Sequence, residues 1–317
     1  MFKRVLKVSA GGVALGLVGM GGIYQMRLKQ NSSVSSDDFN AMQDQKLLRQ
    51  HMEKAVSPLG GAEPLKMYRY STCPFCGKVK AFLDYHKIAH ECIEVEPIFK
   101  SEIQGNGYYK VPQLRFGSKS KGPFLVDSDV IVDRLSEVLP DKDKNNKEWK
   151  KQMLDPEVRK WREYARERLV RYLVININTS LLESWRGYSY IDEHDTIAPH
   201  NKIFLKVLGA PVMYFVSKYK TLPALAKGDG YDPSVVPPTE ALRNVLKEWA
   251  QEGLRGKEYQ GGQRPSVADI EVYGVLQSIR GHHVYDEIVR SIPTVKKWLN
   301  NMDTQTSTNT SRPANKN

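Results

Sequence analysis

Two cysteines separated by two residues, Cys73 and Cys76, lie between a strand-like run, 65–70, and a helix-like run, 78–85. A helix N-terminus carries partial positive charge, which favours the thiolate form of a cysteine placed there. The thiolate is the nucleophilic form of cysteine near neutral pH. The motif therefore predicts a redox or thiol-transfer site, with Cys73 as the exposed nucleophile and Cys76 as its modulator or resolving partner.

Two other interpretations of the cysteines fit the sequence less well. A zinc site would join Cys73 and Cys76 to His86 and His90, but only nine residues separate Cys76 from His86. Zinc fingers usually leave about 12 or more residues there, and this gap has the apolar pattern of a core-facing helix. Inert burial suits Cys92, in the middle of a strand, because buried cysteines behave as small hydrophobes. We therefore predict no metal site.

The order of elements after the cysteines predicts a thioredoxin-like domain. Strand, CxxC turn, helix and strand are followed by two further strands and a helix. The strands are expected at 65–70, 90–96, 111–116 and 124–126, and the helices at 78–85 and 130–139.

Two further positions in this order suit a glutathione site. Val111 and Pro112 stand before a strand, where thioredoxin-like folds hold a cis proline, and the backbone of Val111 would pair with an extended cysteinyl ligand. Asp127 and Ser128 begin a helix, where a carboxylate, a hydroxyl and amide donors would hold the γ-glutamyl end of glutathione. A plain N-cap is the simpler interpretation of this pair taken alone.

The chain divides into segments of different character. Beyond the thioredoxin-like part, apolar residues recur with helical periodicity, and Ser266 to Asp269 resembles a capping box. The apolar run 203–216, interrupted by Gly209 and Pro211, indicates a buried helix pair or a dimer or membrane-facing surface. The expected segments are a hydrophobic anchor or targeting segment (1–29), a polar tether (30–61), a thioredoxin-like domain (62–140), a charged linker (141–151), a helical domain (152–302) and a disordered tail (303–317).

The charge and the N-terminal segment indicate a membrane location. The net charge is +11, from 47 basic and 36 acidic residues, which favours anionic surfaces such as membrane headgroups. The basic residues are interleaved with acidic ones, so we predict no nucleic-acid partner. Three cysteines are too few for a disulfide framework and indicate a reducing compartment. Nineteen uncharged residues, 8–26, lie between basic flanks, which favours a membrane anchor. We expect the membrane to be mitochondrial rather than that of the Golgi or another endomembrane. A cleaved presequence is the alternative.

The motifs together resemble the membrane-associated prostaglandin E synthase type 2 family. The similarity extends over about residues 62–300 and rests on the runs 70–84, 110–112, 127–128, 160–162, 209–218 and 261–269. It implies a thioredoxin-like N-domain of the glutaredoxin and glutathione transferase (GST) type, followed by an all-α GST C-terminal-like domain. A homodimer and an N-terminal hydrophobic anchor are also implied.

The resemblance implies isomerisation of the prostaglandin endoperoxide PGH2 to PGE2. Cys73 would act on the lipid endoperoxide, with Tyr70 and Cys76 as further catalytic residues. Glutathione would be held by a set of residues around the thiol, and haem would bind together with it. The implied glutathione-binding residues are Phe75, Val111, Pro112, Asp127 and Ser128.

Two other functions remain open for a chain of this pattern, because fold relatives often differ in function. One is a glutathione-linked thiol oxidoreductase or transferase, acting on a thiol substrate. The other is a non-enzymatic accessory subunit of a mitochondrial membrane complex, which the glycine-rich N-terminal segment and basic charge suit.

Overall fold

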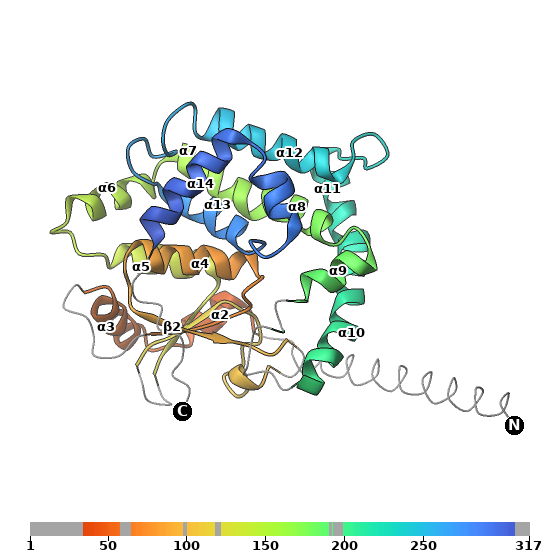
Figure 1. Cartoon of the computed structure of the whole chain (residues 1–317). Helices are drawn as coiled ribbons and strands as arrows, with labels where there is room; N and C mark the ends of the chain where they lie inside the picture. The colour runs from red at the N-terminus through yellow and green to blue at the C-terminus, as the bar shows by residue number, and fades with distance from the viewer. Residues whose placement is uncertain are drawn as a thin grey trace, which may run out of the picture.

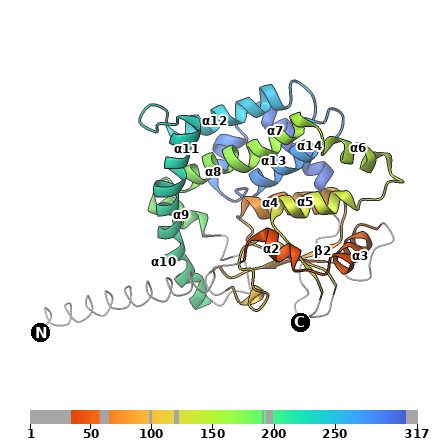
Figure 2. The same ribbon diagram turned by 180° about the vertical axis from the view of Figure 1, so that it is seen from behind.

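The computed structural model describes residues 34–57, 65–97, 100–117, 122–189, 192 and 199–307. A β-sheet forms one layer, helices α4 (Pro74–Tyr85) and α5 (Ser128–Glu137) form the next, and a larger group of helices covers them (Figure 1). The view from behind shows the same three layers (Figure 2). The predicted anchor, 1–29, lies outside the described residues.

The sheet has four strands in the order β2-β1-β3-β4. Its strands are β1 (Leu65–Arg69), β2 (His90–Glu94), β3 (Gln113–Arg115) and β4 (Phe124–Val126). β1 pairs in parallel with β2 through the crossover helix α4, and antiparallel with β3, which in turn pairs antiparallel with β4. The Val111–Pro112 peptide bond before β3 is cis, as predicted. This topology confirms the thioredoxin-like domain.

The helical domain confirms the all-α prediction for the second half of the chain. α7 continues through a π-helical segment, η2, into α8, and α10 continues through η4 into α11. The bounds are α7 Pro156–Glu163, η2 Tyr164–Leu169, α8 Val170–Ile177, α9 Leu181–Gly187, α10 Pro199–Val216, η4 Ser217–Thr221, α11 Leu222–Asp229, α12 Pro238–Glu248, η5 Trp249–Gly253, α13 Val267–Gln277, η6 Tyr285–Val289 and α14 Pro293–Thr306, with a short 3-10 turn, η1, at Ser101–Ile103 in the first domain.

The two domains meet where α4 crosses α13. A Cβ atom placed on Gly77 would lie 2.0 Å from the carbonyl oxygen of Gly274, and one on Gly274 would lie 2.4 Å from that of Gly77. Only glycine permits so close an approach of two backbones. Beside this contact, the fully buried Lys78 lies 3.0 Å from the carboxylate of Glu271 and also pairs with Asp129.

The segment predicted as a polar tether differs from that prediction, because it contains two helices, α2 (Ser36–Ala41) and α3 (Gln45–Ala55). In α2, the Asn40 side chain donates to the Val126 carbonyl and accepts from the Val126 N–H, at 2.9 and 3.0 Å. These bonds pair the N–H and carbonyl groups of Val126 in the edge strand β4, which would otherwise be unpaired. Leu48 and Met52 of α3 are buried in the main core.

The predicted charged linker and tail also contain helical structure. α6 (Lys144–Gln152) lies within the linker, and its Trp149 is buried, donates from Nε1 to the Ser136 hydroxyl at 2.9 Å and stacks on Tyr85. The last helix, α14, continues to Thr306, which is buried. Single anchoring side chains therefore fix segments whose overall composition is polar.

The apolar run 203–216 is part of one continuous helix, α10, which passes through Pro211 rather than breaking into a pair. It runs along one side of the molecule (Figures 1 and 2). Ile203 and Phe215 are 65% and 52% exposed, so this helix is not the buried pair that the sequence allowed. Within the part of the chain that the structure describes, no helix has both the length and the apolar character needed to cross a bilayer.

Candidate active site

Cys73 is the N-cap residue of α4, in the turn that follows β1, and Pro74 takes the first helical position. Proline suits this position because its missing N–H would have no helical partner there. The Cys73 N–H donates to the Tyr70 carbonyl at 3.1 Å, and the Cys73 carbonyl accepts from the Gly77 N–H at 2.9 Å. The turn is therefore rigid, with Cys73 half-buried at its tip and Cys76 buried behind it.

The two thiols have opposite pKa shifts. A hydrogen bond from the Cys76 thiol lowers the pKa of Cys73, and the backbone N–H groups of Cys76 and Phe75 add to this, although burial opposes it. Burial raises the pKa of Cys76 well above its ordinary value, and its contact with Cys73 raises it further. Cys73 is therefore the thiolate of the pair and Cys76 the thiol that stabilises it.

Two lysines of α4 lie close to the turn in sequence, but both pair with carboxylates. Lys78 forms ion pairs with Glu271 and Asp129. Burial alone would lower the pKa of Lys78, but the two carboxylates raise it by more. Lys80 pairs with Asp84 on the next turn of α4, at 2.5 Å. The positive potential at Cys73 therefore comes from backbone N–H groups and the Cys76 thiol.

Replacing Cys76 by alanine tests this arrangement. Cys76→Ala removes the thiol hydrogen bond, so the pKa of Cys73 is expected to rise. Each unit of rise lowers the thiolate fraction at neutral pH about tenfold. Rates of alkylation of Cys73 by iodoacetamide, measured from pH 5 to 10, should show a midpoint below 9.0 in the natural protein and a higher midpoint in the variant. Equal midpoints would show that Cys76 has no influence on Cys73.

A cavity of about 480 Å³ opens in front of Cys73, between the two domains. Tyr70, Cys73 and Phe75 form one wall. The opposite wall comes from α8, α9, α10 and the end of α13, and combines apolar with polar side chains. It includes Val170, Val174, Ile177, Asn178, Ser184, Arg186, Tyr188, Ser189, Met213, Gln277, Arg280 and His282. The sequence signalled none of these as site residues, because Val170, Val174 and Ile177 have the same spacing as an ordinary core face.

Of the predicted glutathione-binding residues, Phe75 lies in the cavity wall, whereas Val111, Pro112, Asp127 and Ser128 are not among its lining residues. Val111 packs against the same cluster as Tyr70, formed by Tyr68, Val95 and Ile103. Pro112 is buried.

Asp127 and Ser128 begin α5, and Ser128 is buried. Oδ1 of Asp127 accepts from the N–H groups of Asp129 and Val130, at 3.0 and 3.4 Å. Asp127 is therefore an N-cap whose Oδ2 takes no part in the cap.

The described lining of the cavity includes an imidazole, the Cys73 thiolate, the Met213 thioether and the phenols of Tyr70 and Tyr188, but nothing in it singles out a haem site. Haem iron is usually held by an imidazole, a thiolate, a thioether or a phenolate. His282 is the sole imidazole among the described lining residues; its Nε2 is buried, and its Nδ1 accepts from the Val284 N–H at 3.3 Å. The Cys73 sulfur is held by Cys76. We therefore derive no step through haem.

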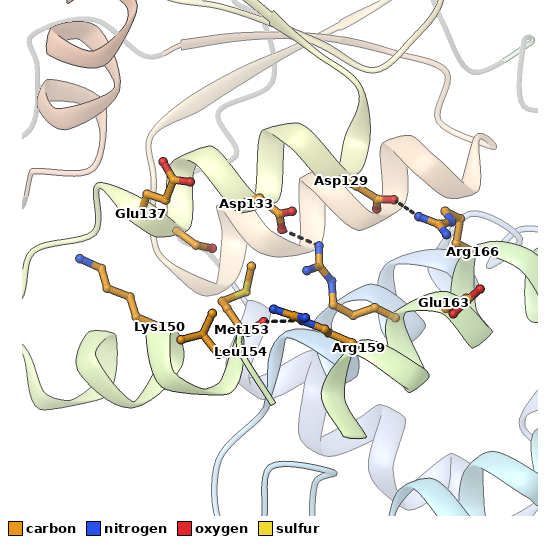
Figure 3. A pocket seen from close by; sticks show the side chains of 11 residues that line it. Asp129, Asp133, Glu137, Lys150, Met153, Leu154, Arg159, Glu163 and Arg166 are labelled. Carbon is orange, nitrogen blue, oxygen red and sulfur yellow. Dashed lines mark hydrogen bonds and ion pairs between the residues drawn. The ribbon is translucent and has the colours of Figure 1, made fainter. Parts of the chain in front are cut away.

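A second cavity, of about 710 Å³, lies between α5, α6 and α7. Figure 3 shows Asp129 of the first domain and Arg166 of the second pointing toward each other at this cavity. Arg162 pairs with Asp133 at 2.7 Å, and Arg166 pairs with Asp129 at 2.9 Å. These pairs join the domains, and the cavity contains no thiol or other strong nucleophile among its described lining residues.

Comparison with known proteins agrees with the architecture. The glutaredoxin family model matches residues 65–120, the part that contains the CxxC turn and the cis proline. Over 313 residues the chain is 30% identical to the prostaglandin E synthase 2 of Danio rerio, which covers 84% of this chain and 79% of that protein. The chain belongs to the prostaglandin E synthase 2 family.

Another member of the prostaglandin E synthase 2 family, from Mus musculus, is 29% identical over 92% of this chain and 80% of its own length. Among solved structures, glutaredoxin 2 from Salmonella typhimurium in complex with glutathione is 17% identical, with a TM-score of 0.47. That alignment covers 77% of this chain and 95% of the glutaredoxin.

Proposed function

We propose that this chain isomerises the endoperoxide PGH2 to PGE2, with glutathione bound beside Cys73. The observation that carries the proposal is the Cys73 thiolate at one wall of a 480 Å³ cavity whose other wall is partly apolar. Cavities of this size suit a small-molecule ligand. Apolar side chains suit the chains of a lipid, and Arg186 and Arg280 suit its carboxylate. The name of the curated relatives supports the same substrate class.

The chemistry is an isomerisation without net redox change. The Cys73 thiolate attacks one peroxide oxygen, so that a sulfur–oxygen bond forms, the oxygen–oxygen bond breaks, and the other oxygen takes a proton to become the hydroxyl. Loss of the hydrogen on the carbon that bears the sulfur-bound oxygen then forms the ketone. The electron pair of that carbon–hydrogen bond expels the sulfur, and the thiolate is restored. A lowered pKa of Cys73 favours both its attack and its departure.

Glutathione fits the surface next to the cavity. The side chain of Val111 packs on the same cluster as Tyr70, and its backbone would pair with an extended cysteinyl group. The N-terminus of α5 would meet the γ-glutamyl carboxylate. Oδ2 of Asp127 would pair with the ammonium.

The direct test is to incubate the purified chain with PGH2, with and without glutathione, and to measure PGE2 by mass spectrometry. We expect PGE2 to form faster than in spontaneous decay, and glutathione to increase the rate. PGE2 formation equal to that in a protein-free control would overturn the proposal.

Filling the cavity should separate lipid turnover from thiol reactivity. Val174→Phe adds a ring to the wall opposite Cys73, so PGH2 turnover should fall at least about tenfold, as expected when a substrate is misplaced. Iodoacetamide is small, and its rate with Cys73 should stay within a factor of two, which would show that the thiol itself is intact. A parallel fall of both rates would mean that the substitution acts on the fold or the thiol.

A glutathione-linked thiol oxidoreductase is the second candidate, and the opposite pKa shifts of the two cysteines favour it. In this reaction Cys73 attacks a disulfide, a thiolate leaves, and Cys76 or glutathione resolves the new mixed disulfide. Cys76→Ala distinguishes the two functions. An isomerase should recover its rate at high pH, when Cys73 becomes ionised again. Disulfide reduction measured without glutathione, which needs Cys76 to resolve the mixed disulfide, should stay lost at every pH.

A further inference from the structure

Three side chains of metal-ligating type converge away from the cysteines, although the sequence spacing predicted no metal site. Glu183 belongs to α9, and His282 and His283 lie between α13 and η6. One ligand atom from each lies within 4.8 Å of the other two. Glu183 is about 100 residues from the histidines in sequence, so no local spacing could reveal the cluster.

Two of these ligand atoms are buried without a hydrogen-bond partner. They are Oε2 of Glu183 and Nε2 of His282. Buried polar atoms nearly always have a partner, and these two lie 3.7 Å from each other, so one shared ligand could contact both. Glu183 Oε1 accepts from Arg186 at 2.7 Å, which holds the carboxylate with Oε2 toward the imidazoles.

The separations suit a small cation. Glu183 Oε2 lies 3.7 Å from Nε2 of His282 and 3.4 Å from Nδ1 of His283. Ligands at about 2.0–2.1 Å from a tetrahedral zinc ion are about 3.3–3.4 Å apart. The carboxylate oxygen therefore already has nearly the spacing from each imidazole that such an ion requires, and the two imidazole nitrogens lie within 4.8 Å of each other.

We propose that Glu183, His282 and His283 bind one divalent transition-metal ion of the zinc class. Two imidazoles and one carboxylate are a common zinc ligand set, with water in the fourth position. The His283 side chain is 40% exposed, so water reaches the ion from that side. Metal binding through Nε2 requires a proton on Nδ1 of His282, so the long 3.3 Å bond from the Val284 N–H is given up.

The ion would fix one wall of the Cys73 cavity. Ser184 and Arg186, next to Glu183 on α9, line the cavity, and so do Gln277 and Arg280 at the end of α13. An ion held by Glu183 and the two histidines ties these two parts of the wall together. The inference does not depend on which substrate enters the cavity.

The test compares zinc binding by the full chain, prepared without a histidine tag and stripped with a chelator, with binding by His283→Gln and Glu183→Gln. We expect one zinc ion per natural chain in a chelator competition and an at least about tenfold weaker affinity in each variant, since even the loss of an outer partner costs that much. Cobalt should give the visible absorption of a tetrahedral site, and zinc should raise the melting temperature of the natural chain by more than that of His283→Gln or Glu183→Gln.

His90→Gln is the matched control, because Nε2 of His90 lies 3.6 Å from Oδ1 of Asp84 but has no second imidazole in the described cluster. It should bind zinc like the natural chain. Equal zinc affinity in the natural chain, His283→Gln and Glu183→Gln, or no binding by any of them, would overturn the proposal. Circular dichroism of each metal-free variant distinguishes the loss of a ligand from the loss of the fold.

Discussion

Cys73→Ser is expected to lower thiol-dependent turnover at least about 10³-fold, the scale seen when an enzyme loses its nucleophile. The reason is that Cys73 is the cysteine of the turn with a lowered pKa, whereas that of Cys76 is raised and its side chain is buried. Serine keeps the size of the side chain but is not ionised near neutral pH. Turnover of PGH2 and of glutathione mixed disulfides by the variant would measure the loss.

The same substitution should leave the fold intact. Serine is among the preferred N-cap residues, so its hydroxyl can keep the interaction of this side chain with the N–H groups of Phe75 and Cys76. The melting temperature should therefore stay the same or rise slightly, so that lost activity cannot be attributed to unfolding.

Cys92→Ser is the control for the loss of a thiol elsewhere, because Cys92 lies in β2 and burial raises its pKa. It should keep full activity. Unchanged activity of Cys73→Ser with both substrates would refute a catalytic role for this thiol.

Local signals predicted the first domain well. The CxxC turn, the strand order and the proline before β3 depend on residues close together in sequence. The capping box is of the same kind, since the Ser266 hydroxyl accepts from the Asp269 N–H at 3.3 Å and the Asp269 carboxylate accepts from the Ser266 N–H at 2.8 Å. Such patterns can be recognised without knowledge of the tertiary structure.

The features that the sequence could not predict depend on distant partners. The Asn40 side chain forms hydrogen bonds with the backbone of Val126, 86 residues away. A polar segment thereby becomes part of the sheet domain. Lys78 follows the CxxC turn in sequence, but its partners are Asp129 and Glu271 from later helices. The far wall of the cavity could not be distinguished from core, since only the tertiary structure shows that its apolar side chains face an open space.

Gly274→Ala is expected to be the most destabilising of these substitutions, because its new methyl group would lie 2.4 Å from the Gly77 carbonyl oxygen. Contacts of backbone atoms cannot be relieved by rotating a side chain, so α13 and α4 must separate. Overpacking of a core usually costs about 1–3 kcal/mol, and a clash against backbone belongs at or above the upper end of that range. Urea unfolding should therefore show a loss of about 3 kcal/mol or more.

Gly228→Ala should have the opposite effect, an increase in the free energy of unfolding. Gly228 lies in α11, and the nearest atom to a new Cβ there is Nη1 of Arg171, at 4.0 Å. Alanine is favoured over glycine in a helix, so this variant should gain up to about 1 kcal/mol. Equal unfolding free energies for the two variants would contradict the close packing of α4 on α13.

The position of this crossing also predicts how activity should respond in any Gly274→Ala protein that still folds. α4 carries Cys73 at its N-terminus, and α13 ends at Gln277 in the opposite wall of the cavity. Separation of the helices therefore moves the thiol away from the wall that would position the substrate, while the CxxC turn remains intact. Turnover should fall by a larger factor than the rate of iodoacetamide alkylation, and an equal fall would place the damage in the turn itself.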